Sequence, residues 1–104
     1  MIKIYHNPRC GKSREGLAIL QESGIDFEVV KYLENIPTKV ELKEVLKLLK
    51  IPAIELVRKN ESIWKEDQVL SALIAYPKFI ERPIVIANNK AIIGRPPSSI
   101  HSII

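Results

Sequence analysis

The sequence contains a single cysteine, Cys10, among its 104 residues. One cysteine excludes an internal disulfide and any zinc site built from several cysteines. If Cys10 performs redox chemistry, the second thiol must therefore come from another molecule. With one cysteine and two histidines in the chain, we expect no bound metal.

Long hydrophobic runs are also missing. No apolar run approaches the roughly 20 residues that a membrane-spanning helix needs. The apolar start, 1–5, is too short for the core of a secretory signal and is followed by polar residues 6–9. We therefore expect a cytoplasmic protein with no membrane partner.

The sequence also has no excess of acidic residues, since it contains 16 Lys and Arg residues and 12 Asp and Glu residues. A net charge of +4 is compatible with a nucleic-acid partner. Several of the lysines, however, recur at helical spacing, which indicates the solvated face of an amphipathic helix. These are Lys39, Lys43, Lys47 and Lys50. Because no RNA-stacking aromatic pair or helix-turn-helix pattern accompanies them, we expect no nucleic-acid partner.

The length predicts one domain, 1–104. Its first third shows an apolar strand over 2–5, a helix over 11–23 stopped by Gly24, and a β-branched strand over 27–30. Such a βαβ unit pairs its strands in parallel.

A helical insert is predicted over about 37–80. Thr38 and Glu41 form a capping box, and the apolar residues that follow recur with helical periodicity. A short helix over 53–57, an irregular stretch over 59–67 and a helix over 68–76 complete the insert.

The last part of the chain changes period. Strands over 84–87 and 90–93 flank Asn88-Asn89, which predicts a β-hairpin, and Pro97 suits the first turn of a final short helix. The order β-α-β, helical insert, β-β-α predicts an α/β protein with a mixed four-stranded sheet. This is the architecture of thioredoxin and glutaredoxin.

The candidate site starts from Cys10. It lies in the polar, basic stretch 6–14, where the first strand turns into a helix, and ligands gather at this end of such sheets. The unpaired N–H groups and positive dipole of a helix N-terminus stabilise a thiolate or an oxyanion. The surroundings therefore predict a nucleophilic cysteine.

Three arginines from separate segments could converge on this thiol: Arg58, Arg82 and Arg95. Guanidinium groups make bidentate bonds to oxygen pairs, which favours binding of an oxyanion. Two alternatives stay open, because Arg58 could be an ordinary surface residue and Arg82 could pair with Glu81.

Two polar residues flank the thiol along the chain. His6, four residues before Cys10, is better placed as an electrostatic or hydrogen-bonding neighbour of a thiolate than as a metal ligand. Ser13 either donates its hydroxyl to the Cys10 sulfur or only helps to start the helix. Pro83 opens the third strand, where this fold usually has a cis-proline facing the cysteine.

Four motifs in order, 5–14, 56–60, 81–85 and 93–97, resemble the glutaredoxin-dependent arsenate reductase (ArsC-like) family over nearly the whole chain. The resemblance implies reduction of arsenate to arsenite, with glutathione as co-substrate, glutaredoxin as partner and no bound cofactor. It also implies roles for individual residues: Cys10 as nucleophile, His6 and Ser13 as thiolate-activating residues, Arg58, Arg82 and Arg95 as the oxyanion-binding set, and Asn7, Gly11 and Pro83 as structural residues of the site.

Two other functions remain open. Relatives of this family include regulators that bind RNA polymerase, some with a Cys-x-x-Cys switch, whose second position is Ser13 here. A general monothiol transferase would use Cys10 with glutathione but needs no set of arginines. The segment between Arg58 and Glu81 is also shorter than in the well-known resistance enzymes. This departure lies beside a proposed substrate arginine and bears on the efficiency with arsenate.

Overall fold

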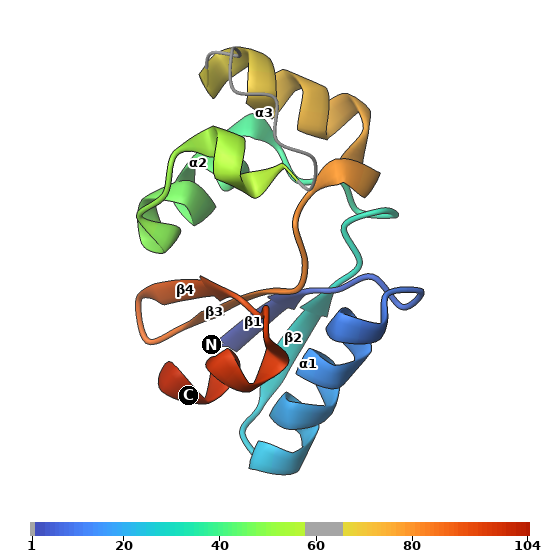
Figure 1. Ribbon diagram of the computed structural model, residues 1–104, viewed down its shortest axis with the longest axis vertical. Coiled ribbons are helices and arrows are strands. Elements are labelled where there is room, and N and C mark those ends of the chain that lie inside the picture. The colour runs from blue at the N-terminus through green and yellow to red at the C-terminus, as the bar shows by residue number, and fades with distance from the viewer. Residues whose placement is uncertain (1, 58–65) are drawn as a thin grey trace.

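A four-stranded mixed sheet forms the centre of the computed structural model, which describes residues 2–57 and 66–104 (Figure 1). The strand order is β2-β1-β3-β4. Their bounds are Ile2–Tyr5 for β1, Phe27–Val30 for β2, Ile84–Ala87 for β3 and Lys90–Ile93 for β4. β1 pairs with β2 in parallel, and the other two pairs are antiparallel. The predicted mixed sheet is confirmed.

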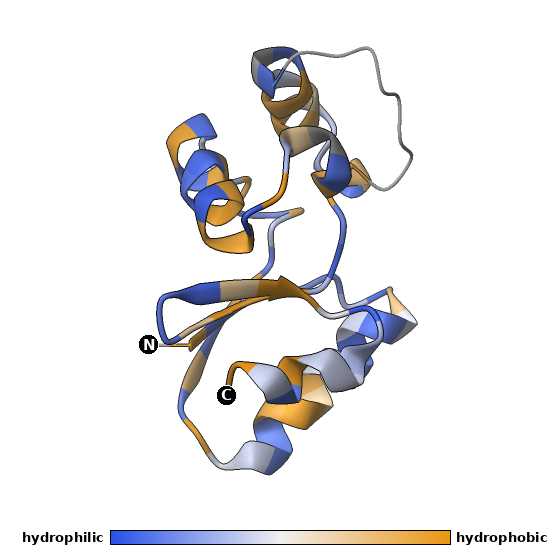
Figure 2. Cartoon of the chain, turned by 60° about the vertical axis from the view of Figure 1, so that its left-hand side comes forward, coloured by the Kyte–Doolittle hydropathy of each residue, from blue (hydrophilic) through white to orange (hydrophobic). Residues whose placement is uncertain are grey.

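Helices cover both faces of this sheet. Helix α1 (Gly11–Ser23) and the 3₁₀ helix η3 (Pro97–Ser102) lie on one face, and helices α2 (Lys39–Leu49) and α3 (Glu66–Ala75) lie on the other (Figure 1). Each side has its own hydrophobic cluster, and Figure 2 shows hydrophobic residues along the strands between them. On the α1 side the buried members are Ile2, Ile4, Leu20, Val85, Ala87 and Ile100.

Local signals account for most of the element boundaries. Thr38 Oγ1 accepts from Glu41 N while Glu41 Oε1 accepts from Thr38 N, both at 3.2 Å, so the capping box starts α2 as predicted. Gly24 ends α1 in the left-handed conformation. Asn88 and Asn89 both have positive φ, as a tight two-residue hairpin turn requires.

Three boundaries differ from the sequence-based expectations. Helix α3 runs over Glu66–Ala75, although we expected an irregular stretch up to 67 and a helix ending at 76. Acidic residues suit a first helical turn because they face the positive end of the dipole. The rest of the expected irregular stretch lies outside the described residues. The short helix expected over 53–57 is a 3₁₀ helix over Ala53–Leu56 (η1), and the expected final short helix is the 3₁₀ helix η3, Pro97–Ser102.

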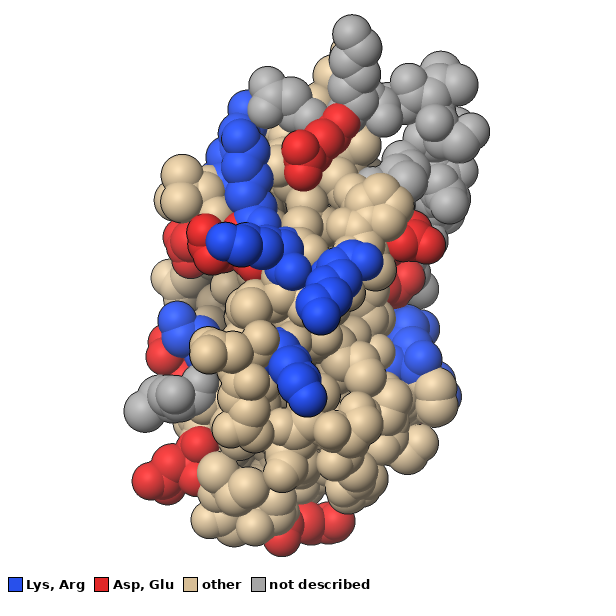
Figure 3. All heavy atoms as spheres, turned by 90° about the vertical axis from the view of Figure 1, so that its left-hand side faces the viewer, with Lys and Arg blue, Asp and Glu red and all other residues tan. Residues whose placement is uncertain are grey.

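The surface over α2 carries charges of both signs. Lys43, Lys47 and Lys50 are exposed and Lys39 is partly exposed. Figure 3 looks at this side of the molecule and shows acidic side chains close to the basic ones. This mixture supports the interpretation of the lysines as a solvated helix face. Within residues 2–57 and 66–104, no helix is long and apolar enough to cross a lipid bilayer.

Strand register brings three distant segments to one end of the sheet. Tyr5, the last residue of β1, pairs with Ile84, the first residue of β3. Ile84 also pairs with Ile93, the last residue of β4. The loop after β1, the segment before β3 and the exit from β4 therefore emerge together, and this is where the predicted site residues lie.

Candidate active site around Cys10

Cys10 occupies the N-cap position of α1, with extended backbone angles and a partly buried side chain. The first N–H groups of an α-helix have no partner within the helix, so they are free to face the sulfur. Burial raises the pKa of the Cys10 thiol. Hydrogen bonds from the Ser13 backbone, the Arg82 side chain and the Lys12 backbone, together with the Arg82 charge, lower it, and the pKa lies below its ordinary value.

The loop before Cys10 is held by its own hydrogen bonds. Asn7 Oδ1 accepts from Arg9 N and the Asn7 carbonyl accepts from Cys10 N, both at 3.0 Å. Asn7 therefore shapes the turn that carries the thiol. Gly11 starts the helix, and among the described atoms a Cβ there would meet only Arg14 Nη2, at 3.8 Å. The space around Gly11 does not demand a glycine.

His6, in the loop before Cys10, and Ser13, in the first turn of α1, form a buried hydrogen-bonded pair. His6 Nδ1 lies 2.6 Å from Ser13 Oγ, and Ser13 Oγ also accepts from Asn7 N at 3.0 Å. One of the two alternatives placed the Ser13 hydroxyl on the sulfur. The hydroxyl turns instead to His6 and Asn7, because Ser13 sits on the inner face of α1 and is fully buried, and its backbone bonds the sulfur. His6 thus reaches Cys10 through Ser13.

The pKa of His6 lies below its ordinary value. Burial is the main cause, the positive charges of Lys31 and Arg14 act in the same direction, and a hydrogen bond with Ser13 acts against them. A neutral imidazole is therefore favoured, and its unprotonated Nδ1 can accept a hydrogen bond from the Ser13 hydroxyl. This arrangement leaves Ser13 Oγ free to accept the Asn7 N–H.

Arg95 lies directly against the thiol. Its Nη2 is 3.7 Å from Cys10 Sγ, although 85 positions separate the two residues. Its Nε donates to the Arg82 carbonyl at 2.8 Å and lies 3.1 Å from Glu81 Oε1. The exit from β4 therefore presents this guanidinium to the sulfur, as the sequence predicted.

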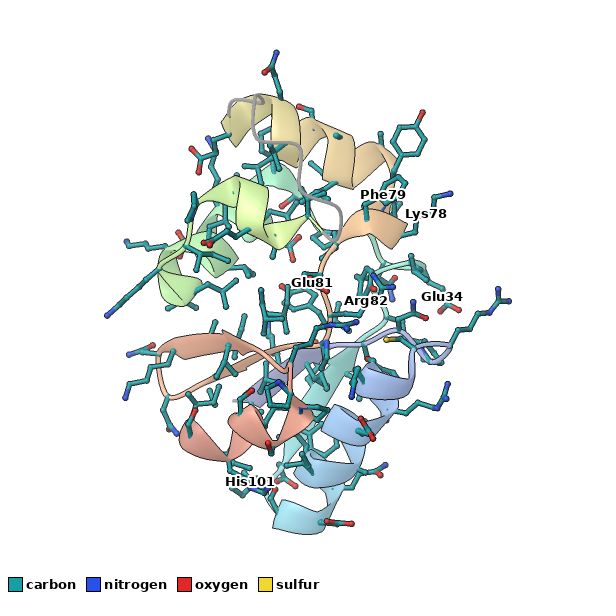
Figure 4. The ribbon with its side chains drawn as sticks, in the orientation of Figure 1. Glu34, Lys78, Phe79, Glu81, Arg82 and His101 are labelled. Carbon is teal, nitrogen blue, oxygen red and sulfur yellow. The ribbon has the colours of Figure 1, made fainter. Side chains whose placement is uncertain are left out.

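Arg82 is buried between the sheet and the insert, and only 4% of its surface is exposed. Its Nη1 donates to the carbonyls of Lys78 and Ile80 at 3.2 and 3.0 Å. The Arg82 guanidinium also lowers the pKa of the Cys10 thiol. Figure 4 shows Arg82 beside the sulfur at the start of α1. The alternative pairing with Glu81 is not the one formed, because the Glu81 carboxylate meets Arg95. Arg82 Nε is buried and has no hydrogen-bond partner among the residues described.

Arg58, the third predicted arginine, lies outside the described residues. The residue before it, Val57, forms an isolated antiparallel bridge with Ile80. Ile80 precedes Arg82 by two positions, so the described chain approaches the segment that carries Arg82.

Pro83 follows a cis peptide bond, as expected for this fold, and a second cis bond precedes Pro96. The Pro83 ring packs where two glycines leave room. A Cβ on Gly94 would lie 2.9 Å from Pro83 Cγ, and one on Gly16 would lie 3.0 Å from the same atom. Gly16 was not among the residues predicted for the site, although a glycine inside a helix is an available signal.

The described residues, 2–57 and 66–104, contain no group of three His, Cys, Asp or Glu side chains placed to hold a metal ion. They do bring a thiol of lowered pKa, a helix N-terminus and two guanidinium groups together. A thiolate can act as a nucleophile, and guanidinium groups can hold the oxygens of the molecule it attacks.

Comparisons with known proteins identify the family. The model of the ArsC family matches residues 5–103. The uncharacterized protein YfgD of Escherichia coli is 45% identical over 99% of this chain and 96% of its own length, and an arsenate reductase of Neisseria meningitidis is 41% identical over 99% and 97%. The solved arsenate reductase of Vibrio cholerae is 39% identical over 99% of this chain and 97% of its own, with a TM-score of 0.93. The chain has the thioredoxin-like fold and belongs to the ArsC family.

Proposed function

We propose that this chain reduces arsenate to arsenite, with Cys10 as the nucleophile. The observation that carries the proposal is the 3.7 Å approach of Arg95 Nη2 to Cys10 Sγ at the start of α1. The positive charge of Arg82 lowers the pKa of the same thiol. Two relatives with high identity bear the name arsenate reductase, which supports the same reaction class.

In the first step the Cys10 thiolate attacks the arsenic of arsenate. A sulfur–arsenic bond forms, and a protonated arsenate oxygen leaves as water. Arsenic remains in the pentavalent state at this point. The low pKa of Cys10 favours the reaction because only the thiolate is a strong nucleophile.

The arginines hold the oxygens of the adduct. Arg95 Nη2 already faces the sulfur, and Arg82 Nε is a buried donor with no partner in the described ranges 2–57 and 66–104, which a bound oxygen can satisfy. Preorganised donors of this kind contribute about 2.7–4 kcal/mol each to a transition state. We assign Arg58 to the same set because the chain before it approaches Arg82 at the bridge between Val57 and Ile80.

His6 and Ser13 support the thiolate indirectly. Their buried hydrogen bond fixes the first turn of α1, and the backbone of Ser13 then faces the sulfur. Asn7 joins the same network through its backbone N–H. In this role the pair orients the donors that stabilise the thiolate, and neither side chain takes the proton of Cys10.

External thiols must complete the reduction because the chain has no second cysteine. Glutathione attacks the adduct and releases a second water, which leaves arsenic bound to two sulfurs. The thiolate of glutaredoxin then attacks the glutathione sulfur. A mixed disulfide forms, its two sulfurs lose two electrons, and arsenic takes up both as it becomes trivalent. Hydrolysis releases arsenite and regenerates Cys10.

The experiment is a coupled assay of NADPH consumption with arsenate, glutathione, glutaredoxin and glutathione reductase. We expect turnover with the wild-type chain and none with Cys10→Ser. Circular dichroism of the variant provides the control for folding. Equal rates for the two chains, or no arsenate-dependent oxidation with either, would reject the proposal.

A further inference from the structure

We propose that Glu81 is a positioning residue whose carboxylate holds the Arg95 guanidinium so that its Nη2 faces the Cys10 sulfur. The consequence for oxyanion binding rests on the proposed function. The geometric part concerns only the chain itself and can be tested without arsenate turnover.

The contacts of Arg95 carry this inference. Its Nε has a single hydrogen, which it donates to the Arg82 carbonyl at 2.8 Å, and Glu81 Oε1 forms an ion pair with the same nitrogen at 3.1 Å. A guanidinium is planar and rigid, so holding the Nε edge sets the direction of the terminal nitrogens. Nη2 then lies 3.7 Å from Cys10 Sγ.

Glu81 is itself held in place. Its backbone N donates to the Leu56 carbonyl at 2.7 Å, and its Oε1 lies 3.4 Å from Arg82 N. The preceding residue, Ile80, is buried and bridges to Val57. Only 21% of the Glu81 side chain is exposed, and Figure 4 shows it near Arg82 in the segment that links the insert to β3. The Glu81 carboxylate therefore lies on a segment before β3 that backbone hydrogen bonds and packing hold in place.

The Glu81 carboxylate places a negative charge beside the two arginines of the candidate oxyanion site. A carboxylate close to a thiolate raises the thiol pKa and repels an incoming anion. The positive charges of Arg82 and Arg95 act in the opposite direction, since they stabilise a thiolate and attract an anion. The presence of the Glu81 carboxylate beside an anion site is explained if Glu81 orients the arginine that binds the anion.

Two substitutions separate orientation from charge: Glu81→Gln and Glu81→Ala. Both remove the negative charge, but glutamine keeps a side chain of the same length, with an oxygen that can lie beside the Arg95 guanidinium as Glu81 Oε1 does. The readout is the pH profile of Cys10 alkylation by iodoacetamide, which reports one residue because the chain has no other cysteine. Glu22→Gln, an exposed carboxylate near the far end of α1, is the matched control for loss of charge.

We expect a higher thiol pKa in E81A than in E81Q, with alkylation about threefold slower below the pKa, the size of one net hydrogen bond. Arsenate should also protect Cys10 from alkylation at lower concentration in E81Q than in E81A. Identical pKa values in the two variants would overturn the inference, because charge alone would then explain Glu81.

A double-mutant cycle tests whether Glu81 acts through Arg95. In an Arg95→Ala background, the difference between E81Q and E81A should vanish. A difference that persists would overturn the inference, since Glu81 would then act on Cys10 by another route. If the two variants differ as expected while the wild type fails to reduce arsenate, the positioning role stands and the proposed function fails.

Discussion

The two sides of the site are held in different ways. On the thiol side, residues 6–13 are organised by hydrogen bonds within one loop and one helical turn, such as the contact between His6 and Ser13. On the guanidinium side, Arg82 and Arg95 depend on segments far apart in the chain, brought together by strand register and by packing around Pro83. Changes on the two sides should therefore differ in the size of their effects.

Replacing the planar guanidinium of Arg95 should have the largest effect on catalysis. Arg95→Lys retains the charge but loses the geometry that lets one edge meet Glu81 and the other face Cys10. We expect kcat/KM for arsenate to fall about 100-fold, as for loss of one preorganised donor, with an unchanged free energy of unfolding. Steady-state kinetics and denaturant unfolding measure the two. Unaltered kcat/KM would contradict the bidentate role.

Filling the space beside Pro83 should weaken the guanidinium side through packing. In Gly94→Ala the new Cβ would lie 2.9 Å from Pro83 Cγ and 3.1 Å from Ile100 Cδ1. We expect a loss of about 2 kcal/mol in the free energy of unfolding, as is typical of overpacking. Gly11→Ala, where a Cβ has ordinary room, is the control for stability and should be close to neutral. Equal losses in both variants would refute this account.

Breaking the buried hydrogen bond on the thiol side should cost less. Ser13→Ala removes the partner of His6 Nδ1 and of Asn7 N. We expect a loss of about 1 kcal/mol in stability and a higher Cys10 pKa, because the first turn of α1 is less well held. The pH profile of alkylation measures the pKa. A Cys10 pKa equal to that of the wild type would show that the pair does not act on the thiol.

The titration of His6 should give the smallest effect. Its pKa is lowered in the folded chain, mainly by burial. The unfolded chain then binds more protons between the lowered pKa and the ordinary value near 6.5. Stability should therefore be complete above that window and decline as the pH falls through it. Chemical denaturation between pH 5 and pH 8 should show this slope, and His6→Gln should flatten it.

The thiol side was largely accessible to sequence reasoning. Cys10 follows an apolar strand and precedes a helix stopped by Gly24, so its place at a helix N-terminus follows from local patterns. The capping box of Thr38 and the turn at Asn88 and Asn89 are equally local, and the structure contains both. The direction of the Ser13 hydroxyl was not accessible, because it depends on which face of α1 is buried.

The guanidinium side was predicted only as a set of residue types. The sequence singled out Arg82 and Arg95 and left open whether Arg82 pairs with Glu81. The structure pairs Glu81 with Arg95 instead, because Arg82 is buried against the carbonyls of Lys78 and Ile80. Such a choice of partner depends on the relative placement of two strands, which local patterns do not encode.

By itself, the sequence determined the order of the elements and the position of one thiol at a helix start, and it excluded an internal disulfide. These properties follow from spacing, capping and the count of one residue type. Only the tertiary structure decided which guanidinium edge faces Cys10 and which carboxylate holds it. Side-chain direction across 85 positions is set by strand register and core packing, which form only when the whole chain folds.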